Sequence, residues 1–191
     1  MGLLGWLKRE MPADGNPELR AWRQAWQAAA QASAVDTAEV AALRASLDRL
    51  ALPEDDLEIE REMLDGLDRK MALASSIVES GLPAIPTGHR IVGHDICHFS
   101  APVSVPDDPA QPTGRLLLTS GRAIFQGGVR GTTIAWHTVG DAAHVDRDLV
   151  LVTVSRESLH RFRCNTYADA MCAAHLARLL SPKSRRAEPG V

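Results

Sequence analysis

The chain has 191 residues, of which 45% are hydrophobic and 24% charged, and its formal net charge is −3. These proportions are typical of a soluble globular protein, and the small negative charge gives no overall electrostatic case for binding nucleic acid. Three cysteines without a regular spacing argue against a disulfide-stapled secreted domain. No apolar run approaches the roughly 20 residues that span a bilayer, and the N-terminus lacks a signal-peptide pattern, so we expect a cytoplasmic protein.

The first 15 residues combine a short apolar patch with two basic residues. This combination is typical of an interfacial membrane anchor, in which Trp lies at headgroup depth beside basic side chains. The alternative is that the apolar side chains pack on the helices that follow. The candidate membrane-contact residues are Leu3, Leu4, Trp6, Leu7, Lys8 and Arg9.

Residues 16–81 are predicted to form a helical region of two to three helices. Asn16, Pro17 and Glu18 supply a capping side chain, a proline suited to the first turn and an acidic residue at the positive end of the helix dipole. A second helix is expected to start at a capping box over residues 36–39. A third is expected to start after Pro53, and Gly81 is a good C-terminal stop for it. Apolar residues recur at helical spacing in these segments: Leu19, Trp22, Trp26 and Ala29; Val40, Leu43, Leu47 and Leu50; Leu57, Leu64, Leu67, Met71, Ala74 and Val78.

Some of these apolar residues are seven positions apart, which is the period of a coiled coil. Against a coiled coil, Pro53 breaks the pattern and Glu60 occupies an inner position of the first heptad. An antiparallel helical hairpin or small bundle is therefore as well supported as pairing between chains.

Residues 81–88 are rich in Pro and Gly and mark the expected domain boundary. Beyond them the apolar period changes from helical to two, which predicts strands. Ser120 and Gly121 read as a two-residue hairpin turn, in which Gly would supply a positive φ. The expected strands are one or two within 91–105, followed by 114–119, 122–126, 130–136, 142–145, 149–154 and 159–164.

A final helix is predicted after residue 165. Thr166 and Asp169 have the spacing of a capping box, and an apolar stripe runs from Ala168 to Leu179. Pro182 ends the pattern, and residues 182–191 form a basic tail that we expect to be flexible.

Seven short antiparallel strands followed by one amphipathic helix resemble a pleckstrin-homology-like (PH-like) domain. Residues 114–125, GRLLLTSGRAIF, look like the hairpin of the GRAM branch and its bacterial PH-like relatives, where Gly-x-Leu-x-Leu-Thr precedes a short turn and Arg-Leu-Ile-Phe. The resemblance covers residues 88–181. It implies an α+β chain whose antiparallel β-barrel or sandwich is capped by the C-terminal helix. Such domains are non-catalytic and bind phosphoinositides, other lipids, peptides or protein surfaces.

Inositol phosphate binding in such domains generally uses Lys and Arg around the first inter-strand loop. Here that loop, residues 104–113, contains Asp107 and Asp108 and no basic residue. Residues 91–165 hold seven Arg and no Lys against six Asp and one Glu, so their charges balance. Arg115, Arg122 and Arg130 are the candidate ligand-binding residues, on the hypothesis that they cluster near the hairpin. The alternative is that they pair with the carboxylates.

Four possible zinc ligands lie within ten residues: His89, His94, Cys97 and His98. Their spacing matches no known zinc finger, and on a strand His94 and His98 would share one face while Cys97 faces the other. A complete site would need Cys164, His144 or His160 as well. We therefore expect neither a metal nor another cofactor.

The sequence contains no nucleophile elbow, P-loop, dinucleotide fingerprint or zinc protease motif. Cys97 and His98 do not form a catalytic dyad on a strand, because adjacent strand residues face opposite ways. We therefore expect no catalytic residues and no small-molecule substrate. The chain is predicted to be a non-catalytic binding or adaptor protein that recognises another protein or its own copy through an exposed sheet edge or the helical stripes. The alternative is peripheral membrane association through residues 1–9.

Overall fold

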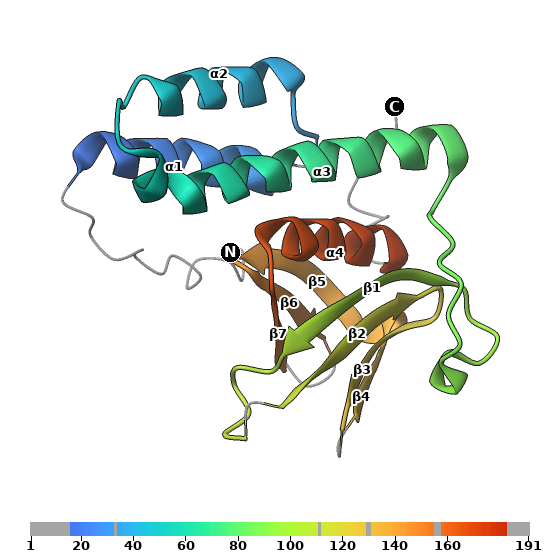
Figure 1. Cartoon of the computed structure of the whole chain (residues 1–191). Coiled ribbons are helices and arrows are strands. Elements are labelled where there is room, and N and C mark those ends of the chain that lie inside the picture. Colours follow the sequence, from blue (N-terminus) through green and yellow to red (C-terminus); the bar gives the residue numbers. More distant parts are fainter. Residues whose placement is uncertain (1–15, 33, 111, 129–130, 155–157, 183–191) are drawn as a thin grey trace.

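The structure, a computed structural model, describes residues 16–32, 34–110, 112–128, 131–154 and 158–182. Within these residues the chain forms four α-helices and one seven-stranded antiparallel sheet (Figure 1), which confirms the predicted α+β class. The helices are α1 (Pro17–Gln31), α2 (Thr37–Asp48), α3 (Glu58–Ser80) and α4 (Tyr167–Leu180). The strands are β1 (Cys97–Ser104), β2 (Thr113–Thr119), β3 (Arg122–Gly127), β4 (Gly131–Ala135), β5 (Val139–Val145), β6 (Asp148–Thr153) and β7 (Leu159–Cys164). Short 3-10 turns are η2 (Glu54–Leu57), η3 (Arg90–Val92) and η4 (Trp136–Thr138).

The helix ends lie where the capping residues predict them. Asn16 Oδ1 accepts hydrogen bonds from the backbone N–H groups of Glu18 and Leu19, at 2.9 and 3.2 Å. Asp36 caps α2 through the N–H of Ala38 at 2.9 Å. Gly81 follows α3 with a φ of 80°, a left-handed conformation that favours glycine.

The strand order in the sheet is β4-β3-β2-β1-β7-β6-β5. β4 and β5 are therefore its two edge strands, although they are consecutive in the chain. β1 pairs with β2 along most of its length but with β7 only at Val103 and Ser104. The sheet is strongly curved, and α4 lies across its concave face (Figure 1).

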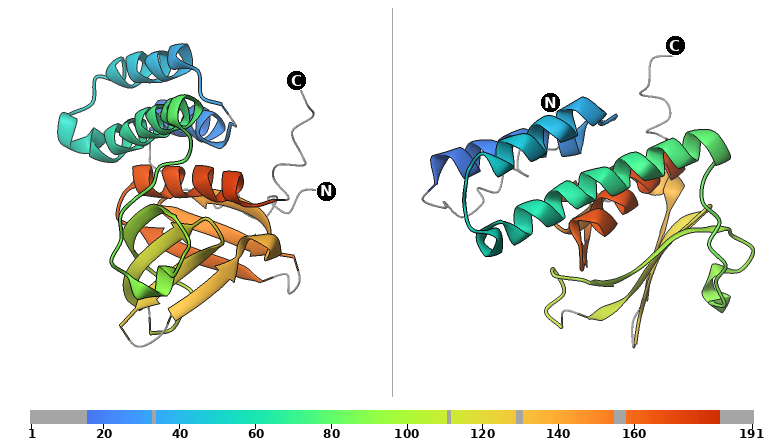
Figure 2. Two further views of the ribbon diagram at one scale, coloured as in Figure 1. Left: turned by 90° about the vertical axis from the view of Figure 1, so that its right-hand side faces the viewer. Right: turned by 45° about the horizontal axis from the view of Figure 1, so that its top comes forward.

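The main core lies between the sheet and α4. It takes alternate residues from the strands, such as Leu116 and Leu118 of β2, together with Ala173 and Leu176 of α4. This alternation is the one expected of strands with one buried face. A second cluster lies on the other side of α4, where Tyr167 and Met171 pack against α1, α2 and α3. Figure 2 shows the resulting layers, with α4 between the sheet and the other helices.

The apolar stripes of the helical region are mostly buried or half-buried within the same chain; Val78, near the C-terminal end of α3, is the exception and is 88% exposed. Trp22, Leu43, Leu47 and Leu64 are all less than 7% exposed, and their cluster includes residues of α4. The helices thus form a small bundle that shares α4 with the sheet. Residues 81–88 connect the two parts in sequence, but the two parts are not separated in space.

Glu60, the polar residue at an inner heptad position, is completely buried. Its carboxylate accepts a hydrogen bond of 2.7 Å from Nε of Arg23 on α1. The pair explains how a charged residue occupies a position that the heptad pattern assigns to an apolar one, because a buried charge requires a hydrogen-bonded partner.

The tip of the β2–β3 hairpin differs from the prediction. Gly121 does not have a positive φ; the glycines with positive φ in the described residues are Gly81 and Gly93. Instead the side chain of Thr119 closes the turn, because its Oγ1 accepts a hydrogen bond of 3.1 Å from the N–H of Arg122. A Cβ on Gly121 would lie 3.1 Å from the carboxylate oxygens of Asp95, a tight contact that the Asp95 side chain would have to relieve by shifting.

At the start of the sheet, residues 91–105 contain one strand, β1, within the one or two that are predicted. It is preceded by the 3-10 turn η3 and a further turn at Gly93. His94 therefore lies before the strand, and the expectation that it shares a strand face with His98 is wrong. The remaining predicted strands are all present, with ends shifted by up to three residues.

Candidate functional site

The candidate ligand-binding arginines are not brought together. Arg115 Nη1 donates to Ser100 Oγ at 3.0 Å, and Arg122 Nε donates to Asp95 Oδ2 at 3.1 Å. Arg115 pairs with Gln126 in the β2–β3 register, four residues along β3 from Arg122, which is a separation of roughly 13 Å. Arg130 lies outside the described residues.

Other arginines of the sheet are paired with carboxylates. Asp148 is 1% exposed and receives hydrogen bonds from Arg163 Nε at 2.7 Å and from Arg161. Burial alone raises the pKa of Asp148, but the hydrogen bonds from these two arginines outweigh it and hold the pKa below its usual value. Arg161 also reaches Asp107 at 3.1 Å. Phosphate groups would therefore have to compete with carboxylates already in place.

The histidines and cysteine near residue 97 have structural contacts. His98 is 6% exposed, and its Nδ1 lies 2.6 Å from the carbonyl oxygen of Pro83. The Cys97 thiol is buried, donates to the carbonyl of Phe99 at 3.2 Å, and has a raised pKa because of its burial. His89 and His94 are exposed. No group of three or more metal-ligating side chains occurs in the part of the chain that the structure describes.

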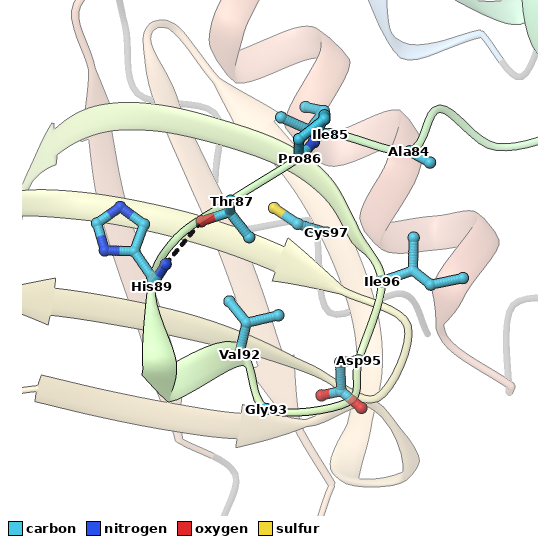
Figure 3. Close-up of a pocket in the computed structure, with 10 residues that line it drawn as sticks. All are labelled: Ala84, Ile85, Pro86, Thr87, His89, Val92, Gly93, Asp95, Ile96 and Cys97. Atoms are coloured by element: carbon cyan, nitrogen blue, oxygen red, sulfur yellow. Dashed lines mark hydrogen bonds between the residues drawn. The ribbon is translucent and has the colours of Figure 1, made fainter.

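A groove lies on the convex face of the sheet, where sequence reasoning did not predict a site. The segment from residue 82 to residue 96 crosses this face, and Val92 buries Leu117 and Ile124 together with Cys97. The segment is tied to the strand by a hydrogen bond of 2.8 Å from the N–H of Ile85 to the carbonyl of Cys97. The hollow is open to solvent, has a volume of about 280 Å³ and is lined by residues 84–87, 89, 92, 93 and 95–97 (Figure 3).

Exposed isoleucines mark this groove. Ile85 and Ile96 line it and are 38% and 53% exposed, and Ile91, at 42%, belongs to the same segment. They are three of the six large hydrophobic side chains that are exposed among the described residues. Exposed apolar side chains scattered singly need no explanation, but two that line one hollow, with a third in the same segment, indicate an interaction surface.

The groove offers little charge to a ligand. Asp95 is its only lining carboxylate, and it is engaged by Arg122 and, at 3.0 Å, by Thr119 Oγ1. No Lys or Arg lines it. A neutral, apolar group is therefore the best match. Sequence reasoning missed the groove because the isoleucines at 85, 91 and 96 follow neither the helical nor the strand period.

Several buried basic groups lie between the helices and the sheet and have structural roles. Lys70 Nζ donates to the carbonyls of Ala30 and Ala32, at 2.9 and 2.7 Å, at the C-terminal end of α1. Burial and the nearby Arg178 lower its pKa to about 8. The edge of the Trp26 indole faces the His144 ring, with the centroids 6.2 Å apart. Burial, followed by the charges of Lys70 and Arg178, lowers the pKa of His144 to about 3, so this ring is neutral at pH 7.

A second hollow, of about 390 Å³, lies along the start of α3 and is lined mainly by carboxylates. Its one base, Arg61, pairs with Glu54 at 3.1 Å. Acidic side chains occupy the first turns of η2 and α3, where they complement the positive end of the helix dipole.

The candidate membrane-contact residues, Leu3 to Arg9, lie outside the described residues. Among the helices that the structure describes, none combines the length and the apolar character needed to cross a bilayer.

Comparisons with known proteins do not assign a family. No family model matches the chain, and no curated protein matches it. Among solved structures, it is similar to the C-terminal domain of an unknown protein from Leishmania infantum, with 12% sequence identity and a TM-score of 0.39. That similarity covers 47% of this chain and 88% of the other.

Proposed function

We propose that this chain is a non-catalytic binding protein, that its sheet and α4 form a PH-like domain, and that its partner is another protein. The strand order supports the assignment of the sheet and α4 to a PH-like domain. Strands β1 to β4 form one antiparallel meander and strands β5 to β7 form another. Pairing between β1 and β7 joins the two meanders, and the C-terminal helix covers the concave face. These are the features that the resemblance to PH-like domains leads one to expect.

The observation that carries the choice of partner is the groove with its exposed isoleucines. Its volume of about 280 Å³ lies below the range of roughly 300–1,000 Å³ that is usual for small-molecule sites. It suits one or two side chains of a protein segment. Full burial of one large aliphatic side chain contributes about 1.5–3 kcal/mol, which is enough for a specific anchor.

Charge favours an apolar protein segment over a phosphoinositide. Inositol phosphates require several converging cations, whereas Arg115 and Arg122 lie apart and are both hydrogen-bonded within the sheet. The ion pair with Arg122 also neutralises Asp95 at the groove. We therefore infer a partner that inserts an uncharged apolar side chain, such as Leu or Phe, between Ile85 and Ile96.

A random peptide library displayed on phage, selected on the full chain, tests this function. We expect selected peptides to share an apolar anchor residue. Their affinity should fall at least about tenfold in the variant Ile96→Asp, because the carboxylate would have to be desolvated on binding. Val154→Asp is the matched control, because Val154 is 50% exposed and does not line the groove.

Two results would contradict the proposal. One is the absence of any peptide that binds the full chain above background. The other is a set of peptides whose affinity is the same for Ile96→Asp and for the wild type. Circular dichroism and thermal unfolding of both variants establish that the substitutions, which are at exposed positions, leave the fold intact.

A further inference from the structure

The two edges of the sheet are treated differently by the rest of the chain. On β5, side chains from the C-terminal end of α4 donate hydrogen bonds to backbone carbonyls. Arg178 Nε donates to the carbonyl of Ala142 at 2.7 Å, and Ser181 Oγ donates to that of Val139 at 2.9 Å. Ser181 is completely buried. Two backbone carbonyls of β5 are thus already engaged by contacts within the chain.

The other edge, β4, is open along Gly131 to Thr133, and at its C-terminal end the carbonyl of Ala135 accepts a hydrogen bond of 2.7 Å from Thr138 Oγ1. β4 pairs with β3 on one side, and it ends the strand order on the other, so no further strand of the described residues covers it. Gly131, Thr132 and Thr133 are exposed, and Figure 2 shows β4 at the rim of the sheet, away from the helices. The strand reads Gly-Thr-Thr-Ile-Ala, without a charge or a proline. Proteins commonly protect an edge strand with charged residues or prolines, because an unprotected edge pairs with other strands.

The ladder between β3 and β4 shows which backbone groups face the open side. Trp136 donates through its N–H to the carbonyl of Gly121 at 3.2 Å, immediately beyond the pair formed by Arg122 and Ala135. Because bonded and non-bonded pairs alternate in an antiparallel ladder, Thr132 and Ile134 then bond to β3. The N–H and C=O groups of Gly131, Thr133 and Ala135 point outward.

This arrangement is symmetric about Thr133. We propose that two copies of the chain associate by antiparallel pairing of β4 with β4, with Thr133 opposite Thr133 of the partner subunit. In this register Gly131 lies opposite Ala135 of the partner subunit and the reverse, so each of the six outward N–H groups of the two strands faces a carbonyl. The Ala135 carbonyl accepts through its second lone pair, because Thr138 Oγ1 already donates to it. Thr132 lies opposite Ile134 of the partner subunit.

A second copy is a better occupant than an unrelated segment for two reasons. The outward groups of β4 are symmetric about Thr133, so each residue meets its counterpart in a second copy, and the interface is isologous, as in most homodimers. The side chains also permit it. Opposed threonines form favourable cross-strand pairs, whereas like charges at such positions are destabilising, and β4 has none. A contact of five residues per strand is small, so the dimer forms in a concentration-dependent way.

This inference goes beyond the proposed function, because the pairing of β4 needs no occupant in the groove. The groove is formed by residues 84–97, none of which belongs to β4. A chain that remains monomeric could still bind peptide, and a dimer could form without binding any. The oligomeric state and the peptide affinity therefore test the two proposals separately.

Sedimentation velocity of the full chain over a wide range of concentration tests the pairing. We expect a reversible monomer–dimer equilibrium in the wild type. Thr133→Lys should raise the dimer dissociation constant at least about tenfold, because two ammonium groups would oppose each other at the centre of the interface. Thr133→Pro should have a similar effect, because it removes an outward N–H while the ladder to β3 keeps its bonds. Thr113→Lys is the matched control, since Thr113 is exposed on β2, an interior strand of the sheet.

Treatment of the variant Thr133→Cys with a short bis-thiosulfonate cross-linker gives a positive test of the register. In a bonded antiparallel pair the two Cα atoms are about 5.5 Å apart, so the two thiols lie within the span of such a reagent and a covalent dimer should form. The wild type, whose described cysteines include the buried Cys97 and Cys164, serves as the control. The proposal is overturned if the wild type is monomeric at every concentration. It is also overturned if a dimer survives both Thr133→Lys and Thr133→Pro, or if Thr133→Cys does not cross-link.

Discussion

The carboxylate of Glu62 on α3 caps the first turn of α4: its Oε1 accepts a hydrogen bond of 3.0 Å from the backbone N–H of Tyr167. The other carboxylate oxygen pairs with Arg147, in the turn between β5 and β6, and the Arg147 guanidinium lies over the Tyr167 ring, 5.2 Å from its centroid. One side chain of the helical region thus holds the C-terminal helix and a turn of the sheet.

Replacement of Glu62 by Ala should lower the free energy of unfolding by about 1 kcal/mol, the usual value of a helix cap. The change removes the acceptor for an N-terminal N–H of α4 and an anion at the positive end of its dipole. Chemical denaturation measures the effect. Glu58→Ala, an exposed carboxylate on the same helix, should cost less, and equal losses in the two variants would show that the contact with Tyr167 contributes nothing.

Replacement of Gly114 by Ala should destabilise the chain by about 1–3 kcal/mol, the range found for overpacking. A Cβ on Gly114 would lie 2.3 Å from the carbonyl oxygen of Gln126 and 2.8 Å from the Phe125 ring, so the β2–β3 ladder would have to shift. Gly88→Ala is the control, because a Cβ there meets nothing within 4 Å. The measurement is again chemical denaturation, and similar midpoints for the two variants would contradict this account of the first residue of the hairpin motif.

Histidine 144 should make stability depend on pH. Its pKa is about 3 in the folded chain against an ordinary value of 6.5, so between these values the unfolded chain binds more protons than the folded one. Stability therefore falls as pH is lowered from 6.5 toward 3, by up to about 1.4 kcal/mol per pH unit.

The variant His144→Gln should show a shallower decline over the same pH interval, whatever its absolute stability. His137→Gln, at an exposed position, should retain the wild-type slope. The measurement is the free energy of unfolding at a series of pH values. An unchanged slope in His144→Gln would mean that another group, such as the partly buried His160 or His175, is responsible.

Vesicle co-sedimentation separates protein binding from the membrane alternative. We expect the full chain to remain in the supernatant with vesicles of phosphatidylcholine, with or without an added phosphoinositide, because Arg115 and Arg122 are engaged within the sheet. If the full chain pellets and a chain without residues 1–15 does not, the membrane-surface hypothesis for Leu3 to Arg9 is supported instead.

Much of the fold follows from local patterns in the sequence. Asn16, Asp36 and Thr166 each cap a helix through hydrogen bonds that span two or three residues, so their neighbours in sequence are sufficient to predict them. The strands follow from alternation for the same reason: Leu116 and Leu118 face α4 while Leu117 faces the opposite side.

The features that sequence reasoning missed depend on distant contacts. Glu62 and Tyr167 are 105 residues apart, and no periodic pattern connects them. The positive φ that the sequence predicts for Gly121 is wrong. The close neighbour of Gly121 is Asp95, in a different loop, and no local sequence pattern reveals that contact. The groove was missed because Ile85, Ile91 and Ile96 lie in a segment without secondary-structure periodicity, whose position over the sheet only the structure shows.

The most direct test of the groove as a protein-binding site uses the isoleucine methyl groups of the full chain. A peptide selected on the wild type is titrated into protein labelled at the isoleucine δ1 methyls, and the spectra are followed by NMR. The account predicts that the shifts are largest for Ile85, Ile91 and Ile96, while Ile59 on α3 and Ile134 on β4 are little affected. Perturbation centred on Ile59 or Ile134, with the three groove isoleucines unchanged, would contradict it.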